Sequence, residues 1–243
     1  IAQRFVSNKV DLVCTIATPA AQTMANATKE IPIVGTAITD YKVAKLVKDN
    51  SQPGTNVTGT TDMNPVEAQI ELLVKIMPKA KTVGFIYNSS EVNSQLQIEL
   101  AKKAAAARGL KTVEATVSSV NDIQQAAQSL VGKVDAVYVP TDNVLASAMP
   151  NLIKITDEAK IPVFCGEAGM TKAGGVATLG IDYYKLGFQT GEMAADILSG
   201  KAKPQNMAIQ AQKTFTVTLN DAQIKKLGLT IPDEILKEAK GAK

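Results

Sequence analysis

The sequence predicts an α/β protein of two similar lobes, each a doubly wound parallel sheet, with a ligand cleft between them. Two repeats carry this prediction. The segment KVDLVCTI at 9–16 has a second copy, KVDAVYVP at 133–140, and IPIVG at 31–35 matches IPVFCG at 161–166. Long-period repeats indicate duplicated lobes. Strands also alternate with helices along the chain, which is typical of parallel sheets with crossover connections.

Composition excludes several classes of function. The 243 residues are 45% hydrophobic and 20% charged with a net charge of +3, which is typical of a globular protein and gives no support for nucleic-acid or membrane-surface binding. No apolar run reaches the ~18–20 residues that span a bilayer. The chain has no His, which excludes Ser-His-Asp and Cys-His catalysis and the commonest zinc ligand. We therefore expect no metal and no cofactor. Cys14 and Cys165 fall in predicted strands, so we expect two buried thiols.

The first lobe begins with the end of a helix at 1–8, followed by a strand at 12–16 whose apolar run indicates a fully covered parallel strand. Thr18 is predicted to cap the next helix, with Pro19 at its first position. The N–H groups of Ala20, Ala21 and Gln22 would then face the crevice above the sheet, where a carboxylate could bind. An ordinary strand-to-helix turn without a ligand is the alternative.

Thr36 and Ala37 follow the next strand, at 31–35, and form a second candidate ligand loop. We expect a helix at about 41–48 and a short strand at 57–61 that leaves the lobe. By the repeat, the helix end at 1–8 matches 125–132, yet the second lobe has two more strands and a helix before it. The first lobe thus lacks an opening βαβ unit of roughly 40–45 residues, judged from the repeat offset. We expect a sheet without one central strand, in a chain that is a fragment or is completed by another segment.

The second lobe has a clear helix start, because Asn64 caps, Pro65 takes the first position and Glu67 follows. A later helical stretch contains Pro150 and should be kinked or split there. The remaining predicted elements are helices at 65–77, up to 109, 121–131, 183–198 and after 221, and strands at 82–87, 111–116, 135–139, 161–165, 176–180 and 207–219.

Polar groups stand at the carboxyl ends of the predicted strands, where parallel sheets bind ligands. Hydroxyls and amides in lobe one opposite carboxylates in lobe two suit a zwitterion, with –COO⁻ at the first and –NH₃⁺ at the second. The candidate ligand-binding residues are Thr18, Ala20, Thr36, Ala37, Tyr87, Asn88, Asp142, Asn143, Glu167 and Asp182.

Each acidic candidate has a structural alternative. Asp142 and Asp182 could cap helices, Glu167 could be a solvated loop residue, and Tyr87 could belong to the core. Asp142 and Glu167 could also act as a catalytic acid and base. No activated nucleophile, phosphate-binding Gly-rich loop or metal cluster accompanies them, so we predict a protein that is not an enzyme.

The chain resembles the substrate-binding proteins of ABC importers with the type I periplasmic-binding fold, in particular the branch associated with tryptophan and other aromatic amino acids. The resemblance rests on motifs in order along nearly the whole chain: ATPAAQ at 17–22, IPIVGTAITD at 31–40, PGTNVTG at 53–59, IYNSSEVNS at 86–94, VPTDN at 139–143, IPVFCGE at 161–167 and IDYYKLG at 181–187.

The resemblance implies two lobes joined by three crossing segments, near Thr60, Ile181 and Gln212. Lobe one is then expected at 1–60 and 183–212, and lobe two at 61–182 and 213–243. The resemblance also implies an α-carboxylate held by Thr18, Thr36 and nearby amides, and an α-amino group held by Asp142 and Glu167. Tyr87 and Asn88 would face the ligand's side chain. The implied protein is a monomeric extracytoplasmic receptor, as a surface lipoprotein or in the periplasm, that closes on an L-amino acid and delivers it to a membrane permease. The alternatives are another solute, such as a branched-chain amino acid or a sugar, and a ligand-sensing regulator or an enzyme on the same scaffold.

Overall fold

The computed structural model describes residues 1–241, and the chain divides into two compact units. Unit 1 contains residues 1–63 and 181–214, and unit 2 contains 64–180 and the residues from 215 onward. The chain therefore passes from one unit to the other three times, after residues 63, 180 and 214. The predicted crossings are near Thr60, Ile181 and Gln212. Within the described residues, no helix combines the length and the apolar character that crossing a bilayer requires.

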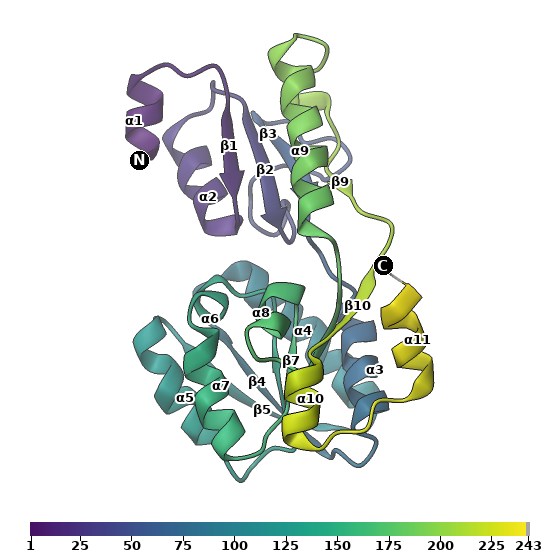
Figure 1. The fold of residues 1–243 in the computed structure, drawn as a ribbon. Coiled ribbons are helices and arrows are strands. Elements are labelled where there is room, and N and C mark those ends of the chain that lie inside the picture. Colours follow the sequence, from purple (N-terminus) through teal and green to yellow (C-terminus); the bar gives the residue numbers. More distant parts are fainter. Residues whose placement is uncertain (242–243) are drawn as a thin grey trace. The chain divides into compact units, whose positions relative to one another are not determined.

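Unit 1 is built on a four-stranded sheet of order β1-β2-β3-β9, in which every pair is parallel (Figure 1). Helix α2 contacts β1 and β2, and α9 contacts β2 and β3. The elements of this unit are α1 (Ala2–Ser7), β1 (Val13–Ile16), α2 (Thr18–Ala27), β2 (Ile33–Ile38), β3 (Val57–Thr61), α9 (Tyr183–Leu198), the 3₁₀ turn η2 (Pro204–Asn206) and β9 (Gln210–Ala211).

Strand β1 forms one edge of this sheet and is not the fully covered strand that its apolar run predicts. Val13 and Thr15 are buried, whereas Cys14 is exposed and Ile16 is 70% exposed. Cys14 is paired with Val34 of β2, so the two side chains lie on one face of the sheet. Val34 packs against Met193 of α9. Because α9 contacts β2 and β3, the same face of β1 stays open, and the prediction of a buried Cys14 thiol is wrong.

The helix predicted at 41–48 is also wrong, because this segment consists of turns. Lys45 has a left-handed backbone with φ of 59°, which an α-helix does not accommodate. The Tyr41 side chain is buried, and its hydroxyl donates to the carbonyl of Thr60 at 2.9 Å. The Asp40 carboxylate accepts from the Val43 N–H at 2.8 Å. These bonds hold the segment against β3 as a set of turns.

Unit 2 is built on a six-stranded sheet of order β10-β8-β7-β6-β4-β5, parallel except for β10, which runs antiparallel to β8 (Figure 1). The predicted α/β class with parallel sheets in two lobes is confirmed. The elements are α3 (Val66–Ile76), β4 (Thr82–Asn88), α4 (Val92–Ala107), β5 (Lys111–Val117), η1 (Val120–Asp122), α5 (Ile123–Leu130), β6 (Ala136–Val139), α6 (Asn143–Ser147), α7 (Met149–Glu158), β7 (Val163–Cys165), α8 (Ala168–Lys172), β8 (Ala177–Gly180), β10 (Thr216–Leu219), α10 (Asp221–Leu227) and α11 (Asp233–Gly241).

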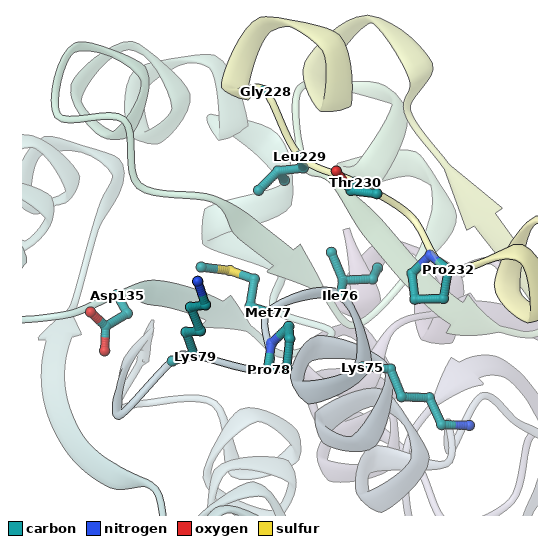
Figure 2. Close-up of a pocket in the computed structure, with 11 residues that line it drawn as sticks. Lys75, Ile76, Met77, Pro78, Lys79, Asp135, Gly228, Leu229, Thr230 and Pro232 are labelled. Atoms are coloured by element: carbon teal, nitrogen blue, oxygen red, sulfur yellow. The ribbon is translucent and has the colours of Figure 1, made fainter.

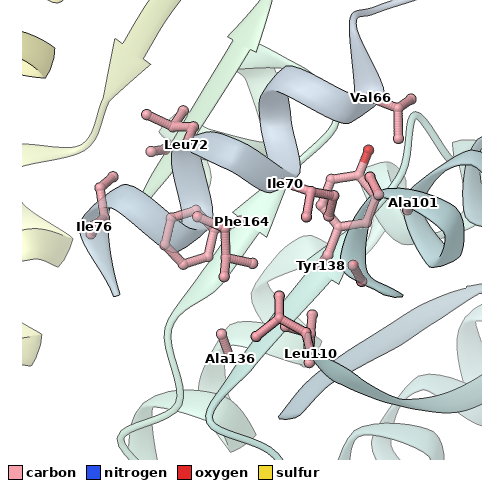
Figure 3. Packing of buried hydrophobic residues seen from close by; sticks show 14 of the residues in the cluster. Val66, Ile70, Leu72, Ile76, Ala101, Leu110, Ala136, Tyr138 and Phe164 are labelled. Atoms are coloured by element: carbon pink, nitrogen blue, oxygen red, sulfur yellow. The ribbon is translucent and has the colours of Figure 1, made fainter. Parts of the chain in front are cut away.

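The unit 2 sheet has a buried apolar cluster on each face, as the alternation of β6 shows. Tyr138 packs with Ile70 of α3 and other residues of one cluster (Figure 3), whereas Val137 packs with Leu130 of α5 in the other. Phe85 meets Tyr138 edge-on, with ring centroids 6.0 Å apart. Helices cover both faces of the sheet and leave the ends of the central strands free for loops, so the candidate residues at the carboxyl ends are held on a rigid support.

The helical stretch that contains Pro150 is split, as the sequence predicts. Helix α6 ends at Ser147, and α7 begins at Met149 with Pro150 in its first turn. A proline is tolerated there because the first N–H groups of a helix have no intrahelical acceptor. The short α6 therefore stays a separate helix directly after β6, with its first turn at the carboxyl end of that strand.

Candidate functional site

Asp142 lies at the centre of the candidate site in unit 2. It caps α6, where its Oδ1 accepts from the Leu145 N–H at 2.9 Å. Its Oδ2 accepts from the N–H of Asn88 and from the hydroxyl of Ser94, both at 2.7 Å. The side chain is 1% exposed. Burial, followed by the nearby charge of Glu91, raises the pKa of the Asp142 carboxyl above its usual value.

Glu91, which the sequence reasoning missed, is a second buried carboxylate beside Asp142. It is 6% exposed and stands just before α4. Its Oε1 accepts from Asn88 Nδ2 and from the Val144 N–H, both at 3.3 Å. Its Oε2 accepts from Asn93 Nδ2 at 3.1 Å and from the N–H and Nδ2 of Asn143, at 3.2 and 2.6 Å. One carboxylate thus ties the loop after β4 to the starts of α4 and α6.

Three of the predicted site residues in unit 2 therefore meet in one group of polar side chains. We name this group the carboxylate cluster and define it as Asn88, Glu91, Asn93, Ser94, Asp142 and Asn143. The six residues come from the carboxyl ends of β4 and β6 and from the first turns of the helices that follow. Within the described residues, neither carboxylate of the cluster forms an ion pair with a Lys or Arg. The cluster thus holds negative charge that no cationic side chain neutralises.

Glu167 and Asp182 both cap helices. The Glu167 carboxylate accepts from the N–H groups of Gly169 and Met170 at the start of α8, at 2.5 Å each. The Asp182 carboxylate accepts from the N–H groups of Tyr184 and Lys185 at the start of α9. Asp182 belongs to unit 1 and Glu167 to unit 2. Their contact with a ligand stays a prediction, and capping is the role that the hydrogen bonds describe.

Tyr87 lies away from the carboxylate cluster. Its hydroxyl donates to Glu114 Oε2 at 2.9 Å on the neighbouring strand β5, and its ring packs against the apolar cluster that contains Tyr138. Glu114 is also paired with Lys102 of α4 at 2.8 Å. Burial and the bond to Glu114 raise the pKa of Tyr87 to about 12. These contacts describe a packing role for the ring, and its contact with a ligand stays a prediction.

In unit 1, helix α2 starts one residue earlier than predicted. Ala17 is the cap residue and has a φ of 73°, while Thr18 and Pro19 occupy the first turn. Thr18 is buried and Ala20 is exposed. The Ala21 N–H donates to the carbonyl of Ala17 at 3.2 Å, so it is not one of the unpaired donors that the sequence predicts. The capping role of Thr18 is wrong because the left-handed turn at Ala17 starts the helix before it.

Thr36 and Ala37 lie on β2, beside the start of α2. The carbonyl of Thr36 accepts from the Ala17 N–H at 3.0 Å, and its hydroxyl accepts from that of Thr60 at 3.2 Å. Ala37 has a φ of 53°, and the pairing of β2 with β3 shifts between Gly35 and Ile38. This is a bulge, which re-aims the backbone at the end of a strand.

Unit 1 also contains a buried carboxylate that the sequence reasoning missed. Asp62 follows β3 and is buried. It accepts from the hydroxyl of Thr39 at 3.2 Å and from that of Tyr183 at 2.8 Å. The Asp62 charge adds to burial in raising the pKa of Tyr41 well above its usual value. The carboxyl ends of this sheet are therefore not purely a hydroxyl and amide surface.

Among the residues that the structure describes, no three His, Cys, Asp or Glu side chains are grouped as a metal ion would require. A cavity of about 680 Å³ lies in unit 2 at the amino ends of the strands, between the end of α3 and the connection from α10 to α11 (Figure 2). Its wall includes Met77, Pro78, Asp135, Leu229 and Pro232. None of the predicted site residues lines it.

The comparisons with known proteins agree on one family. The family model for ABC transporter substrate binding proteins matches residues 1–243. A curated "Tyrosine-binding protein" of Clostridioides difficile is 46% identical over 202 residues, which cover 83% of this chain and 59% of that protein. The chain therefore spans less than two thirds of this relative's length.

Two solved structures are similar along almost the whole chain. One is described as an ABC domain in complex with L-Trp from Streptococcus pneumonia; it is 41% identical with a TM-score of 0.94, and the match covers 98% of this chain and 82% of that one. The other is a conserved domain protein of Vibrio cholerae, which is 42% identical with a TM-score of 0.95 and coverages of 98% and 80%.

Proposed function

We propose that this chain, which belongs to the family of ABC transporter substrate-binding proteins, binds an L-amino acid of the aromatic class and has no catalytic activity. The observation that carries the proposal is the carboxylate cluster of unit 2, in which Asp142 and Glu91 are buried and, over residues 1–241, form no ion pair with a Lys or Arg. Buried charges are normally paired. The α-ammonium of an amino acid supplies the missing positive charge.

The two named relatives support the choice of ligand. One is called a tyrosine-binding protein, and the other was solved with L-Trp. In unit 1, the first turn of α2 and the bulged end of β2 offer backbone N–H groups and hydroxyls of the kind that bind carboxylates. That one ligand contacts residues of both units stays a prediction of the sequence.

The remaining parts of the proposal follow the family. We place the protein outside the cytoplasm, in the periplasm or as a surface lipoprotein, and expect a monomer that delivers its ligand to a membrane permease. Ligand binding would shift the population toward a closed form. A branched-chain amino acid is the second candidate ligand, since the carboxylate cluster would bind its ammonium in the same way.

A thermal-shift screen of the full-length protein tests the proposal. The ligands are the common L-amino acids, a set of sugars, and the amine-free analogues of tyrosine and tryptophan as matched controls. A ligand at 100 times its dissociation constant should stabilise the protein by about 2.7 kcal/mol. We expect L-tyrosine or L-tryptophan to raise the midpoint and the amine-free analogues to have little effect. Stabilisation by sugars alone, or by no amino acid, contradicts the proposal.

A further inference from the structure

Glu91 holds the carboxylate cluster together, yet its own oxygen atoms are fully occupied. We propose that Glu91 is a positioning residue for the ligand's α-ammonium: it fixes Asn88, Asn93 and Asn143 around Asp142, and its charge adds to that of the Asp142 carboxylate that contacts the ammonium. The inference rests on the proposed function, because it concerns the same site. It adds the residue that makes this site selective for a primary ammonium.

The hydrogen bonds exclude direct contact between Glu91 and a ligand. A carboxylate has about four lone-pair positions, and Glu91 accepts from five donors. Asp142 is different, because its Oδ2 accepts from two donors and its Oδ1 from only one, the Leu145 N–H. One acceptor position is therefore left on Asp142 Oδ1. Glu91 acts through the groups that it holds, and Asp142 is the contact residue.

A second observation points to a missing donor. Asn93 is 4% exposed, and its Oδ1 has no hydrogen-bond partner. Its Nδ2 donates to Glu91 Oε2, to the Thr141 carbonyl at 3.1 Å and to the hydroxyl of Ser94 at 3.3 Å. The amide cannot be turned over without pointing its oxygen at the Glu91 carboxylate and the Thr141 carbonyl, so the unpartnered oxygen is a real acceptor.

The side-chain hydroxyl oxygen of Thr141, next to Asp142 in the chain, is likewise buried and without a partner. The cluster thus combines two carboxylates with one amide oxygen that lacks a donor, and the neighbouring Thr141 hydroxyl lies outside the cluster as defined. Buried polar groups without partners are costly. A primary ammonium has three N–H donors and a positive charge, and so meets both needs. A neutral sugar brings hydroxyls but no charge.

The charge of Glu91 has a consequence that a purely structural residue would not have. The groups that face Asp142 come from its own helix α6, from the loop after β4 and from α4, and they are the Leu145 and Asn88 N–H groups, the Ser94 hydroxyl and Glu91. Glu91 is the one charged group among them. It adds to the effect of burial in raising the pKa of Asp142. Removing its charge must lower that pKa, and with it the pH below which ammonium binding is lost.

The test measures L-tyrosine affinity by titration calorimetry from pH 4 to 8, for the full-length protein and for Glu91→Gln, which is isosteric but uncharged. We expect Glu91→Gln to bind at least about tenfold more weakly at neutral pH and to lose binding at a lower pH than the wild type. Glu91→Asp keeps the charge on a shorter side chain, so its affinity should fall while the pH midpoint stays near that of the wild type. Glu99→Gln, on the exposed face of α4, the helix that follows Glu91, is the matched control and should bind normally.

Each result decides between the two proposals. Glu91→Gln with wild-type affinity, or with weaker binding but an unmoved pH midpoint, overturns the inference. Failure of the wild type to bind L-tyrosine, L-tryptophan or any other amino acid overturns the proposed function instead. In that case the pKa of the Asp142 carboxyl, measured by carbon-13 NMR in the ligand-free protein, decides the inference about Glu91. If the Asp142 pKa is the same in Glu91→Gln as in the wild type, the charge coupling is ruled out. Circular dichroism confirms that each variant is folded.

Discussion

Strands β1 and β6 both follow the same three residues, Lys-Val-Asp, but lie in different surroundings. All four residues of β6 are buried, and the strand lies between β4 and β7. In β1 every second residue is exposed, and among the described strands it pairs with β2 alone. The local sequence directs both segments into strands, whereas the neighbouring strands and helices determine which faces are covered. Burial is a property of the sheet, and the strand alone does not set it.

The turns after these two strands also differ. Counting from the repeat, Thr18 of unit 1 takes the place that Asp142 has in unit 2. Asp142 caps α6 with a carboxylate in a buried position, whereas α2 has Ala17 as its cap residue and no side-chain cap. A helix without a side-chain cap keeps its positive end available for an anion, and a helix capped by a carboxylate does not. The helix starts that follow the two copies of the repeat therefore differ in electrostatic character.

The largest expected effect tests the difference in burial. By the repeat, Tyr138 of β6 corresponds to Cys14 of β1. Tyr138 is fully buried, and its hydroxyl donates to Gln69 Oε1 at 2.7 Å. Tyr138→Ala leaves a cavity and an unpartnered Gln69 oxygen, so it should lower the free energy of unfolding by about 3–5 kcal/mol.

Cys14→Ala is the matched control and should change stability by less than about 0.5 kcal/mol, because the side chain is exposed. Urea unfolding followed by circular dichroism measures both variants. Equal losses would show that β1 is as well packed as β6 and would break the comparison.

The next effect tests the difference in charge. Asp142→Ala should weaken L-tyrosine binding by about 2–5 kcal/mol, since the ligand's ammonium is left without its carboxylate partner. Thr18→Ala, its counterpart in unit 1, removes one neutral hydroxyl and should cost about 1 kcal/mol. Titration calorimetry at a temperature where both variants are folded measures the difference. Near-wild-type affinity in Asp142→Ala would reduce this residue to a helix cap.

The sequence predicts the regular parts of this fold well, because apolar runs, caps and breakers are local signals. The break between α6 and α7 before Pro150 is an example, whereas α3 begins at Val66 with Pro65 as its cap residue, one position later than Asn64 and Pro65 predict. The segment 41–48 has a helical pattern, but Tyr41 is held by the Thr60 carbonyl and Lys45 turns left-handed. The contact with β3 outweighs a weak local preference there.

The site is harder to predict, because its geometry depends on which side chains in a loop turn inward. For the loop Asn88-Ser89-Ser90-Glu91, the one sign of function in the sequence is that the loop directly follows a predicted strand. The sequence identifies Asn88 but does not show that Glu91 folds back to meet Asn143, which lies 52 positions later in the chain. The same holds for Asp62 and Tyr183, which belong to segments far apart in sequence. The sequence places such residues near the right edge, and only the fold shows their partners.

The smallest effect concerns the third residue of the repeat. The Asp135 carboxylate accepts from the N–H groups of Lys81 and Thr82 at 2.7 and 2.8 Å and so joins the start of β6 to the start of β4. These bonds hold its pKa below the usual value. Asp11 is its counterpart before β1. Among the described strands, none lies beside β1 in the way that β4 lies beside β6. Asp135→Ala should therefore destabilise the protein by about 1 kcal/mol, since the bonds are charge-assisted but exposed, and Asp11→Ala should have almost no effect.

The pH dependence sharpens this last comparison. Because the pKa of Asp135 is lowered by folding, its stabilising contribution is fully present above the unfolded-state pKa of about 3.9 and is lost as the pH falls through the folded-state value. The stability difference between wild type and Asp135→Ala, measured by urea unfolding at pH 7 and again near pH 3, should therefore shrink in acid. A difference that stays constant with pH would assign the effect to packing at residue 135, and an equal loss in Asp11→Ala would show that the two copies of the repeat are anchored alike.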